Sequence, residues 1–205
     1  MTILRNFFQY FRNPRHFSLA LTGLVFLGFS VWLNFVAGTY AYSHMSNGVA
    51  DLFLDNLPTY DVSLLFIEGA AVMVLGILVM CVVYPQRFFD VTATIALMYL
   101  FRAGAISLTH LGPPLTMGDM GLANTITGRF VQGADYFFSG HTALPFLAAL
   151  LFWEKVWVRN IYLACTLLFG VAAIVGHLHY SIDVFAAPFI AYGIYAIRRH
   201  LWKVE

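Results

Sequence analysis

Apolar residues follow one another in runs of 17 to 24 along most of the chain, and short polar segments separate the runs. A helix that crosses the hydrocarbon core of a bilayer needs about 20 apolar residues, so each run predicts one transmembrane helix. The predicted helices cover residues 17–40, 62–84, 91–111, 137–153, 161–178 and 179–197. The pattern therefore predicts an all-α, polytopic membrane protein with six transmembrane helices in one domain, residues 17–197.

The residues before the first run, 1–16, show a different pattern. Ile3, Phe7 and Phe11 recur every four positions, and basic residues occupy the other face. This spacing predicts an amphipathic helix that lies on the membrane surface and ends at Pro14. A secretory signal peptide is the alternative, but its apolar region has roughly 7–15 residues, and the run that follows here is longer.

Composition agrees with the apolar pattern. The 205 residues are 60% hydrophobic and 10% charged, whereas a soluble domain has roughly 25% charged residues. These values exclude a water-soluble globular enzyme, a disordered chain and a nucleic-acid binder. The two cysteines, Cys81 and Cys165, both lie inside apolar runs, which predicts inert buried thiols rather than a disulfide framework or a zinc site.

The positive charges are unevenly distributed between the two sides of the membrane. With the N-terminus inside, nine of the eleven Lys and Arg residues fall in cytoplasmic segments: Arg5, Arg12, Arg15, Arg87, Lys155, Arg159, Arg198, Arg199 and Lys203. The opposite side collects acidic residues: Asp51, Asp55, Asp61, Asp119 and Asp135. The positive-inside rule then predicts that both termini are cytoplasmic, with residues 198–205 as a basic tail.

Ionisable side chains within or beside membrane spans are costly and point to function. The chain has eight of them: Glu68, Arg102, His110, Asp135, His141, His177, His179 and Asp183. All except Glu68 and Arg102 fall at the outer end of a predicted span or in the adjoining outer loop. We therefore expect a site at the outer face, which is the periplasmic side in a bacterial inner membrane or the lumenal side in an organelle. Snorkelling interfacial side chains are the alternative.

One candidate motif is the segment Ser139-Gly140-His141-Thr142. Ser139 suits a helix N-cap, which places the next three residues in the first helical turn. The unpaired amides of that turn and the positive end of the helix dipole can bind an anion, and Gly140 allows close approach. His141 then lies beside the bound anion, where a protonated imidazole can donate a proton.

A second candidate motif pairs His179 with Asp183, spaced i and i+4. On a helix the two side chains share a face and can hydrogen-bond. A carboxylate on one ring nitrogen fixes the tautomer and leaves the other nitrogen able to attack or to accept a proton. A simple capping pair at the start of the sixth span is the alternative.

Together the two motifs resemble the lipid phosphate phosphatase superfamily. Its usual Lys-x6-Arg-Pro motif is absent around Arg102, and Ala172 and Ala173 stand where a Ser-Arg pair precedes the histidine. The sequence is more similar to the sphingomyelin synthase family. GADYFFSGHT and HYSIDV match two of that family's motifs, MYLFR approximates a third, and LPTYD, residues 57–61, loosely matches a fourth.

The resemblance implies transfer of a phospho-head-group between lipids through a phosphohistidine. It implies His179 as nucleophile, Asp183 as its orienting carboxylate and His141 as acid and base. Substrate or phosphate contacts are expected from Arg102, Arg129, Asp135, Ser139, Gly140 and Tyr180, with Asp135 orienting His141. The implied partners are a phospholipid or lipid phosphate donor and a lipid alcohol or water as acceptor, with no cofactor or metal.

Several alternatives stay open. The same histidines would serve a lipid phosphatase or a phospholipase C-type hydrolase. An intramembrane serine protease would use Ser139, but its usual Gly-x-Ser-Gly motif is absent because position 137 is Phe. A metal site or transporter could use His141, His177, His179 and Asp183. The outer acidic residues, such as Asp51 and Asp55, either attract a choline or ethanolamine cation or are solvated loop charges.

Overall fold

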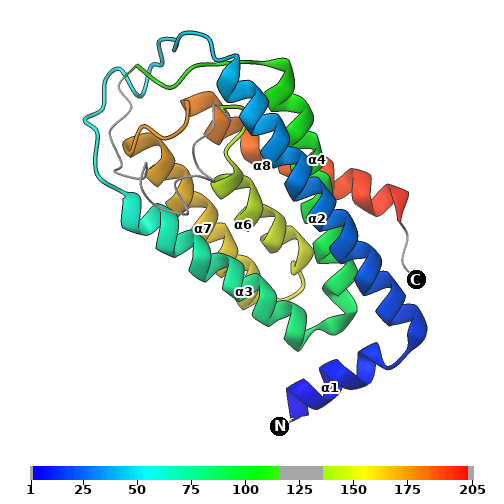
Figure 1. Cartoon of the computed structure of the whole chain (residues 1–205). Helices are drawn as coiled ribbons and strands as arrows, with labels where there is room; N and C mark the ends of the chain where they lie inside the picture. The colour runs from blue at the N-terminus through cyan, green and yellow to red at the C-terminus, as the bar shows by residue number, and fades with distance from the viewer. Residues whose placement is uncertain (1, 116–135, 203–205) are drawn as a thin grey trace.

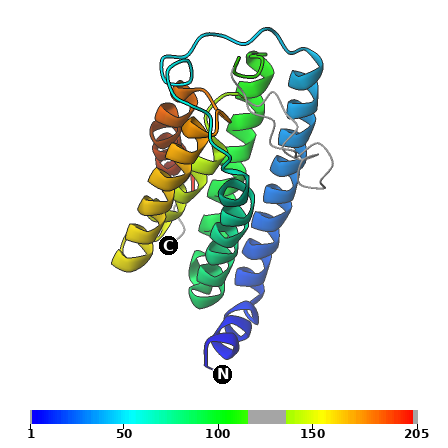
Figure 2. The ribbon, with the colours of Figure 1, turned by 90° about the vertical axis from the view of Figure 1, so that its left-hand side faces the viewer.

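The computed structural model describes residues 2–115 and 136–202, and in these two stretches the chain is helical without a strand. Six helices lie side by side in a bundle, with the short helix α1 at one end of it (Figures 1 and 2). The α-helices are α1 (Thr2–Phe11), α2 (Pro14–Ser43), α3 (Ala70–Val83), α4 (Phe88–Leu108), α6 (Gly140–Leu151), α7 (Val156–Val175) and α8 (Ser181–Leu201). A π-helical turn, η1 (Leu65–Gly69), precedes α3, and a 3-10 turn, η2 (Pro85–Arg87), precedes α4.

Five helical segments among the described residues are long and apolar enough to cross a membrane: Pro14–Ser43, Leu65–Val83, Pro85–Leu108, Val156–Val175 and Ser181–Leu201. This confirms the prediction of an all-helical membrane protein in its main lines. The fourth predicted span is shorter than expected, because α6 has 12 residues instead of the 17 of segment 137–153. The orientation of the termini stays a prediction.

Several predicted helix limits are wrong, and two of them have a local cause. The sixth helix begins at Ser181 rather than at residue 179, because Tyr180 has the extended backbone of an N-cap residue. Pro14 does not end α1, which stops at Phe11, but instead begins α2. Proline suits the first helical position because its missing N–H has no partner there, and Asn13 caps the helix through the Arg15 amide at 2.9 Å.

Helix α2 packs on α4 through small residues. Its buried residues are Ala20, Gly23, Ser30, Ala37 and Ala41. A Cβ added at Gly23 would lie 2.2 Å from Thr92 Oγ1, so the close approach of the two helices requires glycine. Large side chains on the other faces of α2, such as Trp32 and Phe35, are exposed in the isolated chain, as expected for a helix surrounded by lipid.

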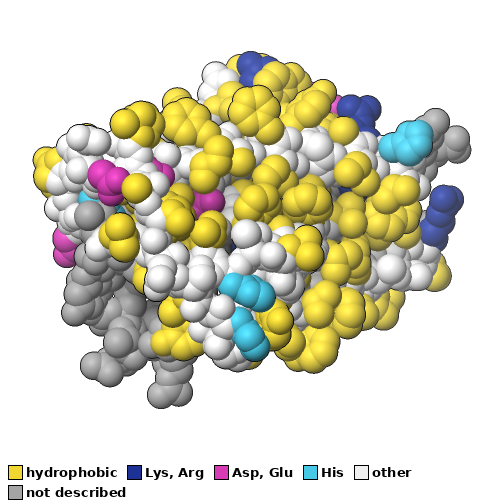
Figure 3. Space-filling model, turned by 90° about the horizontal axis from the view of Figure 1, so that it is seen from above, with side chains coloured by type: hydrophobic (Ala, Val, Ile, Leu, Met, Phe, Trp, Pro, Cys, Tyr) yellow, Lys and Arg dark blue, Asp and Glu magenta, His cyan; other side chains and the backbone are white. Residues whose placement is uncertain are grey.

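Helix α6 lies at the centre of the bundle. Nine of its 12 residues are buried, and Leu147 and Ala149 are fully inaccessible. Its side chains pack with those of α3, α4, α7 and α8 in one apolar core. The view from above shows hydrophobic side chains over much of the visible surface (Figure 3).

The two ends of the bundle differ in their polar contacts. At the end that carries α1, here called the terminal end, Arg198 pairs with Asp90, and Arg87 Nη2 lies 2.5 Å from Glu154 Oε2. The opposite end, here called the site end, is formed by residues 44–64, 109–115 and 176–180 (top of Figure 1). Four histidines that the sequence analysis singled out, His110, His141, His177 and His179, lie toward the site end.

Candidate functional site

The centre of the candidate site is the pair His179 and Asp183. The chain leaves α7 at Gly176 and turns through His177, whose φ of 53° is left-handed, before His179 and the start of α8. His179 Nδ1 lies 3.3 Å from Asp183 Oδ2, and both side chains are buried. When Nδ1–H donates to the carboxylate, Nε2 carries the ring's lone pair. The i, i+4 contact predicted from the sequence is present, although His179 precedes the helix rather than lying on it.

The start of α6 is joined directly to this pair. Ser139 is the N-cap residue, as the motif predicts, and its amide donates to the Asp183 carbonyl at 3.1 Å. Its hydroxyl, in contrast, makes no capping bond and is buried without a hydrogen-bond partner among the described residues. The backbone link brings the SGHT segment and the His-Asp pair together, although 44 positions separate the two linked residues.

Arg102 supplies positive charge at the start of α6. It lies inside α4 with only 6% of its surface exposed, and its Nε donates to the Phe138 carbonyl at 3.5 Å. A Cβ added at Gly140 would lie 3.8 Å from Arg102 Nε, so the guanidinium faces the first turn of α6 with nothing bulky between them. A buried guanidinium beside a helix N-terminus is an arrangement that attracts an anion such as phosphate.

Phe138 holds the backbone in an unusual conformation at this point. Its φ is 34°, in the left-handed region that residues other than glycine rarely adopt, and its side chain is fully buried. A strained residue of this kind persists only where its surroundings fix it, and such residues are common at functional sites. Here the conformation directs the Phe138 carbonyl to Arg102.

His141 lies in the first turn of α6, near two aromatic rings. Its ring stacks on Phe66 of η1 with centroids 3.7 Å apart, and Phe169 of α7 lies 6.1 Å away. The side chain is half-buried. Since His141 is two residues from Ser139, whose amide is bonded to Asp183, both candidate histidines belong to the same region of the bundle.

Tyr180 connects the site to two loops. Its hydroxyl accepts from the Val49 amide at 3.1 Å and donates to the Gly112 carbonyl at 2.9 Å, and only 2% of the residue is exposed. Its ring also contacts Tyr136, which lies edge-on to His179. These contacts give Tyr180 a structural role, and its contact with substrate stays a prediction.

Sequence reasoning misread Asp51. The residue is neither a solvated loop charge nor free to attract a cation, because it is buried and accepts four hydrogen bonds. Oδ2 accepts from the amide and hydroxyl of Ser181, at 2.8 and 2.9 Å, and Oδ1 accepts from the amides of Phe53 and Leu54. Asp51 therefore caps α8 from a distant loop, two residues after His179.

These bonds also explain the acidity of Asp51. Burial raises the pKa of the carboxyl, but the hydrogen bonds from Ser181, Leu54 and Phe53 outweigh that effect and bring the pKa below its ordinary value. The sequence signal was an acidic residue directly before the apolar residues Leu52, Phe53 and Leu54. The partner that gives it a role is 130 positions away.

The remaining candidates either lie outside the described residues or have their described contacts elsewhere. Arg129 and Asp135 lie outside the described residues, as does Asp119. The His110 ring contacts Tyr40 and the Ser107 carbonyl, and His177 Nδ1 lies 3.2 Å from Thr59 Oγ1. Glu68 is exposed on η1. Within residues 2–115 and 136–202, no group of three or more His, Cys, Asp or Glu side chains is arranged to hold a metal ion.

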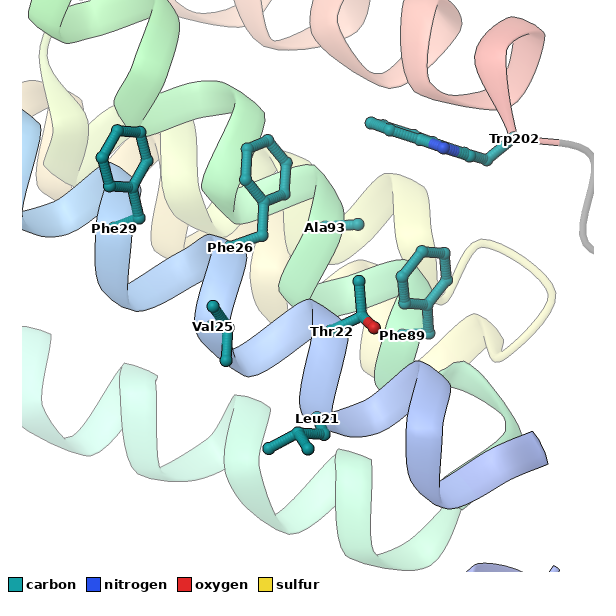
Figure 4. A pocket seen from close by; sticks show the side chains of 8 residues that line it. All are labelled: Leu21, Thr22, Val25, Phe26, Phe29, Phe89, Ala93 and Trp202. Atoms are coloured by element: carbon teal, nitrogen blue, oxygen red, sulfur yellow. The ribbon is translucent and has the colours of Figure 1, made fainter. Parts of the chain in front are cut away.

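A groove of about 570 Å³ lies between α2, α4 and Trp202 (Figure 4). It includes Phe89 and Ala93 of α4. Nine residues of helix, or roughly 13 Å at 1.5 Å per residue, separate Ala93 from Arg102. This groove therefore lies well toward the terminal end and is not part of the candidate site.

Comparison with known proteins gives a family match over the part of the chain that carries the His179–Asp183 pair. The family model described as the PAP2 superfamily C-terminal region matches residues 132–201, about a third of the chain. The matched region contains the SGHT segment, the His179–Asp183 pair and all of α6, α7 and α8. Neither the curated proteins nor the solved structures gave a match. The family match and the apolar helices indicate an integral membrane protein and support the lipid phosphate phosphatase superfamily.

Proposed function

We propose that the chain is a lipid phosphotransferase that moves a phospho-head-group from one lipid to another through a phosphohistidine, as in the sphingomyelin synthase family. The observation that supports it most is the link between the His179–Asp183 pair and the start of α6, made by the Ser139 amide. This link joins a nucleophile with its orienting carboxylate to a helix N-terminus with a buried arginine.

In the first half-reaction, Nε2 of His179 attacks phosphorus and the bond from phosphorus to the donor lipid's oxygen breaks. Asp183 holds the ring in the reactive tautomer and stabilises the positive charge that develops on it. His141 donates a proton to the departing lipid alkoxide. Arg102 and the first amides of α6 stabilise the negative charge on the phosphoryl oxygens, with Gly140 allowing close approach.

In the second half-reaction, the acceptor hydroxyl attacks the phosphohistidine and the phosphorus–nitrogen bond breaks. His141, now neutral, accepts the proton of that hydroxyl. Arg129 would add a phosphate contact and Asp135 would orient His141, both on the strength of the sequence motifs. The reaction would occur at the periplasmic face, or at the lumenal face in an organelle, as the distribution of Lys and Arg favours.

A lipid phosphatase or a phospholipase C-type hydrolase is the second candidate, because water can replace the lipid alcohol in the second half-reaction. The family match also supports this second candidate, because the lipid phosphate phosphatase superfamily is named for phosphatases. The two candidates share the first half-reaction and differ only in the acceptor. Lipid mass spectrometry of vesicles that contain the purified protein, with and without an added lipid alcohol, separates the transferase from the hydrolase.

The test of the shared step is phosphoenzyme trapping with a donor lipid labelled at phosphorus. Wild-type protein and the control His110→Ala should carry acid-labile, alkali-stable label, and His179→Ala should carry none. Label on Ser139, or label that survives in His179→Ala, would identify a different nucleophile. Because the scheme uses no metal, turnover should persist in excess chelator. Reversible loss of turnover that a divalent ion restores would contradict the scheme.

A further inference from the structure

An apolar groove of about 500 Å³ runs along the contact between α3 and α7. Its lining residues are apolar except for Tyr162, whose hydroxyl is bonded to the Met73 carbonyl. The groove opens to the surface, since Val72 and Leu168 on its two sides are 69% and 50% exposed. In a membrane, this opening faces lipid.

Two glycines keep the groove open. A Cβ added at Gly69 would lie 3.3 Å from Phe169 Cζ, and one added at Gly76 would lie 2.8 Å from the Tyr162 hydroxyl. Side chains at these two positions, the last residue of η1 and one in α3, would therefore occupy the space between the helices. The groove depends on two glycines that are seven positions, or about two helical turns, apart.

The groove is continuous with the candidate site. Phe169, at one end of it, is the ring that lies 6.1 Å from His141. Leu65 and Gly69 also line that end, and between them in sequence lies Phe66, which stacks on the His141 ring. The ring proposed to protonate the lipid alkoxide thus adjoins the end of an apolar groove.

The length of the groove suits one hydrocarbon chain. From Phe169 to Trp157, both lining residues, there are 12 residues of α7, or about 18 Å at 1.5 Å per residue. Half of a hydrocarbon core of about 30 Å is about 15 Å, which is roughly the length that one lipid chain spans along the membrane normal. A chain attached to a phosphate at the site end could lie along the groove without bending.

We propose that this groove binds one long acyl chain of the lipid that reacts at His141 and His179. The inference rests on the proposed function for the identity of the reacting lipid. Lipid tails surround the helix bundle in any case, so the groove adds no hydrophobic driving force. It instead orients the reacting lipid, so that the oxygen leaving phosphorus comes next to His141.

The first test compares groove-filling variants with neighbours that do not line the groove. Leu168→Trp and Val72→Trp fill it, whereas Leu167→Trp and Val74→Trp place the same side chain on other faces. Misplacing a reacting group by about 1 Å can cost roughly 100-fold. We therefore expect kcat/KM for a long-chain donor to fall at least about tenfold in the filling variants alone. A nitrophenyl phosphodiester without an acyl chain should be turned over equally by all four variants.

The second test uses phosphatidylcholine vesicles that carry a photoreactive diazirine in the acyl chain. Cross-links should concentrate on α3 and α7 around Leu168 and should decrease in Leu168→Trp. Cross-links spread evenly over the lipid-facing helices, including α2, would show surrounding lipid only. Absence of lipid cross-links around Leu168 would show that no acyl chain occupies the groove, and either result would overturn the proposal.

The two tests separate the groove from the reaction. If wild-type protein turns over neither substrate, the proposed function fails, and the cross-linking pattern still shows whether a chain occupies the groove. If wild-type protein turns over both substrates and the four variants behave alike, the reaction stands and the acyl-chain site is wrong.

Discussion

Replacing Asp51 by alanine removes the acceptor of four hydrogen bonds that tie loop 44–64 to the start of α8. Loss of an N-cap carboxylate costs roughly 0.5–2 kcal/mol, and each buried donor left without a partner costs about 1–3 kcal/mol. Ser181 can turn to water while the Leu54 amide stays buried, so we expect a total loss of about 2–4 kcal/mol. At roughly 2–4 °C per kcal/mol for a chain of this size, Tm should fall by roughly 4–16 °C.

Activity should fall as well, because the cap lies two residues from His179. Asp51→Asn keeps one acceptor oxygen and should lose less stability than Asp51→Ala. The control is Asp61→Ala, which removes an exposed carboxylate bonded only to Ser63 among the described residues and should change Tm little. Thermal unfolding in detergent and turnover of a phosphodiester measure the two effects.

The pH dependence of Tm shows whether the charged Asp51 carboxylate stabilises the folded protein. The pKa of Asp51 lies below its ordinary value of about 3.8, so the folded protein favours the charged form. Its stabilisation is then fully present above about pH 4 and is lost as the pH falls through the lowered pKa. The Tm difference between wild type and Asp51→Ala should narrow in that range. An equal Tm for the two proteins at neutral pH would refute the capping role.

Three further predictions concern other parts of the chain. His141→Ala should be slower by about 10²–10⁴-fold but not inactive, and a substrate with a nitrophenyl leaving group should restore its first half-reaction; equal slowing of both substrates would argue against an acid role. A cysteine at Asn56 should react with an impermeant thiol reagent in intact cells, and one at Gln86 only after permeabilisation; the reverse pattern would invert the topology. Asp90→Ala should cost about 3–5 kcal/mol by leaving the buried Arg198 guanidinium unpaired, and the double variant with Arg198→Ala should lose less, as denaturant unfolding would measure.

The main lines of the fold could be predicted from the sequence because apolar runs of membrane length are a direct consequence of the lipid environment. The i, i+4 contact of His179 with Asp183 and the N-cap position of Ser139 could also be predicted, since both depend on neighbouring residues. The start of α8 could not, because the turn at Tyr180 is fixed by contacts with residues far away in the sequence.

Contacts between segments far apart in the chain could not be predicted from the sequence. Nothing local indicates that Asp51 bonds Ser181, since an acidic residue in a loop is normally solvated. Similarly, the approach of Arg102 to Phe138 depends on how α4 packs against α6. The roles of both residues depend on the three-dimensional arrangement of the helices and loops.

The shortness of α6 has an electrical consequence. Its 12 residues extend about 18 Å, and the turn after it is held at the terminal end by the pair of Glu154 with Arg87. In a hydrocarbon core of about 30 Å, the start of α6 then lies about 12 Å inside the opposite boundary. A negative charge that reaches this depth crosses about 40% of the membrane voltage, or about 0.9 kcal/mol at 100 mV. The occupancy of the site by anionic head groups should therefore change about fivefold for each 100 mV across the membrane.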